Sequence, residues 1–69
     1  MTVTTISGKV VSYDEVLVDG EWLVEMNGEF FVTGSTPNLV TISSGSGIRI
    51  ARGLNKWDAI RDLAEVVAA

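Results

Sequence analysis

The chain has 69 residues, of which 46% are hydrophobic, and it carries a formal net charge of −4. It contains neither cysteine nor histidine, which excludes disulfides, the usual Cys/His zinc sites and every catalytic triad or dyad built on these residues. The hydrophobic content excludes a disordered chain, the lack of a long apolar run excludes a membrane-spanning helix, and the acidic balance disfavours nucleic acid as a partner.

The same composition predicts how the chain is organised and where it is found. No repeat, linker or low-complexity tail interrupts it, so we expect a single domain over residues 1–69. The first nine residues lack a basic region followed by an apolar stretch, so no secretory signal is expected. Together with the absence of cysteine, this favours a cytoplasmic protein. We expect no cofactor, no metal and no enzymatic activity, because the commonest ligands and general base are missing.

The first half of the chain predicts a β-meander. Residues 3–11 are rich in Val, Thr and Ile and predict a first strand, which Gly8 weakens or bulges. Two dipeptides between apolar runs, Asp19-Gly20 and Asn27-Gly28, are typical of two-residue hairpin turns in which both residues need positive φ. They predict three strands near residues 14–18, 21–26 and 29–33.

The middle of the chain predicts two further short strands. Residues 33–38 contain Gly, Pro and Asn and indicate a turn or loop, after which residues 39–43 read as a strand. The Ser/Gly-rich residues 43–47 indicate a flexible connection, and residues 48–51 alternate as a last strand that Gly53 ends.

The last segment changes to helical periodicity. Apolar side chains at helical spacing share one face, opposite the acidic residues, and they are Trp57, Ile60, Leu63, Ala64 and Val67. Asn55 is a good N-cap with Asp58 as a capping-box-like partner, and Leu54 is placed to pack on Ala59 as a hydrophobic staple. The sequence therefore predicts an α+β fold, an antiparallel meander of five to six short strands followed by one C-terminal helix packed on the sheet.

The two hairpin turns also predict which side chains share a face of the sheet. One face contains Leu17, Trp22, Val24, Met26 and Phe31, with Glu29 at its edge. This face suits the helix stripe, so Trp22 and Trp57 are expected in the core. The other face contains Val16, Val18, Leu23, Phe30 and Val32, with Glu21 and Glu25 beside them.

The second face needs a cover that the single helix cannot supply. In one interpretation the sheet curls into a small barrel around it, or the strands of residues 39–51 fold over it. In the other it is a protein interface, with Leu23, Phe30 and Val32 as apolar anchors and an acidic rim that meets a basic partner. The predicted interface residues are Val16, Val18, Glu21, Leu23, Glu25, Phe30 and Val32.

Three other patterns have simpler interpretations. Residues 43–49 resemble an anion-binding loop, but no helix start follows them, which favours an ordinary hairpin loop. Arg49, Arg52 and Lys56 lack interleaved aromatic residues and are interpreted as solvated charges rather than a nucleic-acid surface. Asp14 and Glu15 are adjacent on a strand, so their side chains point to opposite faces and do not form a carboxylate dyad.

These features favour a non-enzymatic protein-binding module with a protein partner. In size, acidity and architecture the chain resembles the small acidic inhibitors encoded by phages, such as anti-CRISPR proteins. That resemblance implies inhibition of a host defence or host enzyme and assigns no residue a role. The alternatives are a self-assembling structural subunit, in which the second face joins identical copies into a homo-oligomer, and a small nucleic-acid-binding barrel, which the acidic balance and the lack of an aromatic platform disfavour.

Overall fold

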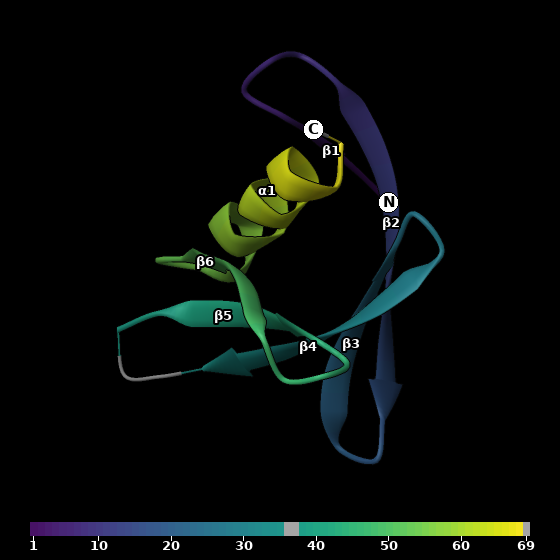
Figure 1. Cartoon of the computed structure of the whole chain (residues 1–69), viewed down its shortest axis with the longest axis vertical. Coiled ribbons are helices and arrows are strands. Elements are labelled where there is room, and N and C mark those ends of the chain that lie inside the picture. Colours follow the sequence, from purple (N-terminus) through teal and green to yellow (C-terminus); the bar gives the residue numbers. More distant parts are fainter. Residues whose placement is uncertain (36–37, 69) are drawn as a thin grey trace.

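The computed structural model describes residues 1–35 and 38–68, which form one meandering sheet and a C-terminal helix (Figure 1). The elements are β1 (Thr2–Thr4), β2 (Val10–Val18), β3 (Glu21–Met26), β4 (Glu29–Ser35), β5 (Val40–Ser44), β6 (Arg49–Gly53) and α1 (Lys56–Val67). Each strand pairs antiparallel with the next, so the order in the sheet is the order in the sequence. The predicted α+β meander with a packed C-terminal helix is confirmed.

The two predicted hairpin turns have the backbone geometry that their dipeptides require. Asp19 and Gly20 have φ values of 50° and 81°, and Asn27 and Gly28 have φ values of 55° and 80°. Positive φ at both central residues matches the turn to the twist of the flanking strands. The cross-strand register across β2, β3 and β4 is the one that the two turns predict.

The N-terminal strand differs from its prediction, because residues 3–11 form a hairpin rather than one weakened strand. The N–H of Thr5 donates to the Lys9 carbonyl at 2.8 Å, and the N–H of Gly8 donates to the Thr5 carbonyl at 3.0 Å. Gly8 has a φ of 91°, which glycine adopts without strain. The Oγ1 of Thr5 lies 2.9 Å from the Oγ of Ser7. The turn thus separates β1 from β2, which begins at Val10.

The same turn recurs between β5 and β6. The N–H of Ser44 donates to the Ile48 carbonyl at 2.8 Å, the N–H of Gly47 donates to the Ser44 carbonyl at 2.9 Å, and Gly47 has a φ of 89°. The Ser44 and Ser46 hydroxyls lie 2.8 Å apart. The segment from Ser44, the last residue of β5, to Ile48 therefore forms a hydrogen-bonded hairpin turn, in agreement with the hairpin-loop interpretation.

Strand ends in the second half of the sheet lie one or two residues from their predicted positions. β4 continues to Ser35, into the predicted loop, of which residues 36 and 37 lie outside the described part of the chain. Gly53 is the last residue of β6 rather than the residue that stops it.

The helix begins at the predicted cap. The Oδ1 of Asn55 accepts a hydrogen bond from the Asp58 N–H at 2.9 Å, which satisfies a donor of the first turn. The Asp58 carboxylate accepts from the Asn55 side-chain amide at 3.2 Å, not from the cap backbone as in a capping box. The predicted staple is wrong, because Leu54 is 79% exposed and does not pack on Ala59.

The core lies between α1 and the side of the sheet that faces it. The sheet twists so strongly that α1 contacts β5 and β6 and also β1 (Figure 1). The C-terminal end of α1 is held by the β1–β2 turn: the Nζ of Lys9 donates to the Ala68 carbonyl at 2.9 Å, and the Ile6 N–H donates to the Glu65 carboxylate. The buried side chains are Tyr13, Val24, Met26, Phe31, Ile42, Ala51, Ala59, Ile60, Leu63 and Ala64.

The two tryptophans are not core residues, contrary to the prediction. Trp22 is 50% exposed and Trp57 is 60% exposed, whereas Ile60 and Leu63 of the predicted helix stripe are fully buried. The reason is the position of α1, which contacts β1, β5 and β6. Trp57 lies in the first turn of the helix, and Trp22 lies beside the β2–β3 turn, at the end of the covered surface.

Candidate functional site

The side of the sheet facing away from α1, here called the outer face, carries all seven predicted interface residues. The pairing register aligns Val16, Leu23 and Val32 as a central row across β2, β3 and β4. Asp14, Glu25 and Phe30 form the next row on one side, and Val18 faces Glu21 on the other. The sheet thus places five apolar side chains between carboxylates on one surface.

The apolar side chains of the outer face are uncovered in the described part of the chain. Phe30 is 55% exposed, Val16 and Val18 are also exposed, and Leu23 and Val32 are half-buried. β5 and β6 continue the same sheet and do not fold over this face. The interpretation of this face as the inside of a barrel is therefore wrong, because the sheet curves around α1 and encloses the opposite side. The role of the seven residues as an interface stays a prediction.

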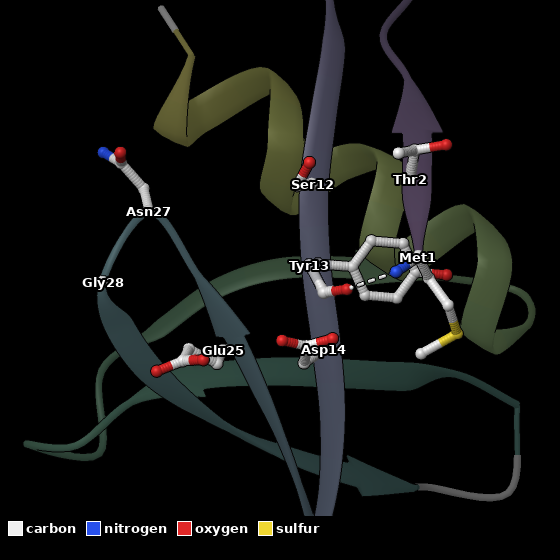
Figure 2. Close-up of a pocket in the computed structure, with 8 residues that line it drawn as sticks. All are labelled: Met1, Thr2, Ser12, Tyr13, Asp14, Glu25, Asn27 and Gly28. Carbon is white, nitrogen blue, oxygen red and sulfur yellow. Dashed lines mark hydrogen bonds between the residues drawn. The ribbon is translucent and has the colours of Figure 1, made fainter.

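One end of the outer face is an acidic pocket. Asp14 lies directly opposite Glu25, and Figure 2 shows the two carboxylates side by side on neighbouring strands. They line a cavity of about 400 Å³ together with Ser12, Asn27 and residues of the N-terminus. Neither carboxylate has an ion pair or hydrogen bond to a described residue. Because like charges directly opposite in a sheet repel, a positive group between them would be stabilised.

The basic residues do not gather into one strip. Arg49 and Arg52 are exposed on β6, where the Arg52 N–H donates to the Asp62 carboxylate at 3.0 Å. Lys56 lies at the start of α1 and pairs with Glu15, and this is the sole ion pair among residues 1–35 and 38–68. The interpretation as solvated charges holds for Arg49 and Arg52, which are exposed, whereas Lys56 is paired with Glu15.

A second cluster lies on the α1 side of the sheet, and sequence reasoning missed it. The Nζ of Lys56 lies 3.0 Å from the Oε2 of Glu15, 6.0 Å from the centre of the Trp22 ring and 5.7 Å from the centre of the Trp57 ring. We call Glu15, Trp22, Lys56 and Trp57 the indole site. Both indoles are within the range at which a cation is attracted to an aromatic face.

Two buried polar atoms accompany the indole site. The Oε1 of Glu15 and the hydroxyl of Tyr13 are both buried, and neither has a hydrogen-bond partner among the described residues. Burial raises the pKa of Tyr13, and the nearby Glu15 carboxylate raises this pKa further, while Lys56 opposes both effects. The sequence does predict one part of this site, because the Asp19-Gly20 turn pairs Leu17 with Trp22 and so brings Trp22 near Glu15. The sequence does not show where the helix begins over the sheet, so it does not predict that Lys56 and Trp57 join this site.

Comparisons with protein-family models, curated proteins and solved structures found no match to the chain. No helix of the described residues is long and apolar enough to span a membrane. Across the same residues, no group of three or more acidic side chains is arranged to hold a metal ion.

Proposed function

We propose that the chain is a non-enzymatic protein-binding module that acts through its outer face. The observation that carries this proposal is the uncovered apolar row of exposed Val16 and half-buried Leu23 and Val32, with exposed Phe30 beside it and carboxylates around it that pair with no described residue. A partner that covers the row removes apolar surface from water. Depletion of charge at the centre and polar groups at the rim are typical of protein interfaces.

The charge of the outer face favours a partner with basic side chains. Asp14 and Glu25 stand opposite each other, and neither pairs with a cation of the described residues. The N-terminal ammonium of Met1, which also lines this pocket, donates to the Tyr13 carbonyl at 3.0 Å, and Glu21 lies at the other end of the face. An arginine or lysine of the partner that enters the acidic pocket would relieve the repulsion between the two carboxylates. Phe30 pairs with Glu25 across the sheet, so it would be covered by the same contact. Exposed aromatic residues of this kind often supply most of the binding energy.

Inhibition is the form of binding that we propose, in line with the resemblance to small acidic phage inhibitors. If the acidic and apolar outer face covers a basic surface of a host protein, the host protein can no longer bind its anionic ligand at that basic surface. We place this activity in the cytoplasm on the absence of cysteine.

The test is affinity capture with matched variants, followed by measurement with the purified captured protein. Phe30→Asp places a charge beside the apolar row, and Val66→Asp is the control, because Val66 is similarly exposed but lies on α1. A partner should be retained by the wild type and by Val66→Asp and bind Phe30→Asp at least about thirtyfold more weakly. Circular dichroism checks that both variants fold.

Three outcomes would contradict the proposal. Equal binding of the partner to Phe30→Asp would show that the outer face is not the interface. A concentration-dependent mass in sedimentation that Phe30→Asp abolishes would identify a second copy as the occupant. Salt-sensitive binding of oligonucleotides by the wild type would instead favour a nucleic-acid partner.

A further inference from the structure

The indole site brings together three groups that attract a cation. Trp22 comes from β3, Trp57 from α1 and Glu15 from β2, and all three lie around the Lys56 ammonium. These are the two tryptophans of the chain, and both are half-exposed or more. Large aromatic side chains contribute most to stability when buried, so a role in folding alone does not account for their position.

Lys56 makes only some of the interactions that the groups of the indole site allow. It contacts one oxygen of Glu15, whose side chain is only 12% exposed, while the other oxygen and the Tyr13 hydroxyl are buried with no hydrogen-bond partner in the part of the chain that the structure describes. An ammonium is a compact point charge. A guanidinium is planar, stacks on an indole face and donates to both oxygens of one carboxylate. The chemistry of the site therefore suits arginine better than the lysine that occupies it.

Lys56 is also easily displaced. Its side chain is 49% exposed and sits on a flexible stem at the first residue of α1. Because the ammonium end of this pair is exposed, it can move to solvent readily, and a guanidinium that takes its place keeps the mostly buried Glu15 carboxylate paired, so the exchange costs the fold little. While it remains in place, its charge opposes the entry of a second cation.

We propose that the indole site binds an arginine side chain of a protein partner, and that Lys56 is a built-in competitor that lowers the affinity. The incoming guanidinium stacks between Trp22 and Trp57 and binds Glu15, while Lys56 moves into solvent. The site lies on the opposite side of the sheet from the outer face, and the inference does not depend on the function proposed above.

The probe is N-acetylarginine N-methylamide, and the readout is intrinsic tryptophan fluorescence. Both tryptophans belong to the site, so any saturable change reports it directly. Lys56→Ala removes the competitor and should bind the probe about five- to tenfold more tightly than the wild type. Glu15→Gln and Trp22→Leu, each combined with Lys56→Ala, should weaken binding by at least the same factor.

Matched controls separate recognition of arginine from nonspecific effects. The citrulline analogue has the same shape without the charge and should not bind, and the lysine analogue should bind more weakly than arginine. Phe30→Asp changes the outer face alone and should leave arginine binding unchanged. No saturable response in Lys56→Ala, or an equal response to citrulline or lysine, would overturn the proposal. Loss of arginine binding in Phe30→Asp would also overturn it.

Discussion

Gly53, the last residue of β6, allows α1 to begin very close to the sheet. A Cβ at this position would lie 2.4 Å from the Ala59 nitrogen, 2.6 Å from the Asp58 Cβ and 2.7 Å from the Asp58 carbonyl carbon. Real Cβ atoms essentially never come within 3.0 Å of another heavy atom. Two of the three contacted atoms belong to the backbone, so Gly53→Ala must push the start of α1 away from β6.

Two opposing effects set the size of the change in stability. Alanine restricts the unfolded chain, which stabilises the folded state by about 0.4–1 kcal/mol where the backbone conformation is compatible. Overpacking costs about 1–3 kcal/mol, and the upper part of this range applies because the contact is with backbone. We expect a net loss of about 2 kcal/mol, which lowers the Tm by about 8–16 °C in a domain of this size.

Thermal unfolding followed by circular dichroism measures this loss. Gly45→Ala is the matched control, because a Cβ at Gly45 meets no atom within 4 Å and Gly45 does not have a positive φ. This control should melt at or slightly above the wild-type temperature. The native fluorescence of Gly53→Ala should also differ, since Trp57 lies in the displaced first turn. A Tm of Gly53→Ala no lower than that of Gly45→Ala would refute the reasoning.

Four further expectations concern the core, the cap, the buried tyrosine and metal. Leu63→Ala removes a fully buried side chain and should lower the free energy of unfolding, measured in urea, by about 2–5 kcal/mol. An unfolding curve close to that of the wild type would show that the core closes around the smaller side chain or that Leu63 is misassigned to the core. Asn55→Ala should lower the free energy of unfolding by about 1 kcal/mol, measured in the same way. Tyr13 has a pKa raised above its ordinary value of 10.0, so the unfolded chain loses this proton first. The stability that Tyr13 contributes should be complete below pH 10 and fall as the pH rises through the raised value, and Tyr13→Phe should remove this part of the fall. Because the chain has one tyrosine, phenolate absorbance follows the titration directly. Adding a chelator should leave the Tm unchanged, and a drop would reveal a bound metal.

The sequence predicts the centre of the sheet well because its turns have strong local signals. Asp19-Gly20 and Asn27-Gly28 each require positive φ at both residues, and a two-residue turn leaves one register for the strands that it joins. That register places Leu23, Phe30 and Val32 together without knowledge of the rest of the fold. The helix is predicted for a similar reason, since its cap and its periodicity are both local.

The missed features depend on how distant elements meet. Periodicity shows that Trp57, Ile60 and Leu63 share a face of the helix, but it does not show how far the covering sheet extends along that face. Here the sheet covers Ile60 and Leu63 and leaves Trp57 beside Trp22 and Lys56. The curvature of the sheet, which decides which side is enclosed, likewise arises from the twist of all six strands together.

The meander has a consequence for the order of folding. Each strand pairs with its neighbour along the chain, so sheet formation requires only short loops to close. The contacts of α1 with the β1–β2 turn join residues 59 positions apart. We therefore expect the Asp-Gly and Asn-Gly hairpins to form early and the docking of α1 against the first hairpin to come last. Because each strand pairs with its neighbour along the chain, the chain should fold on the millisecond time scale, toward the rapid end for sheet proteins.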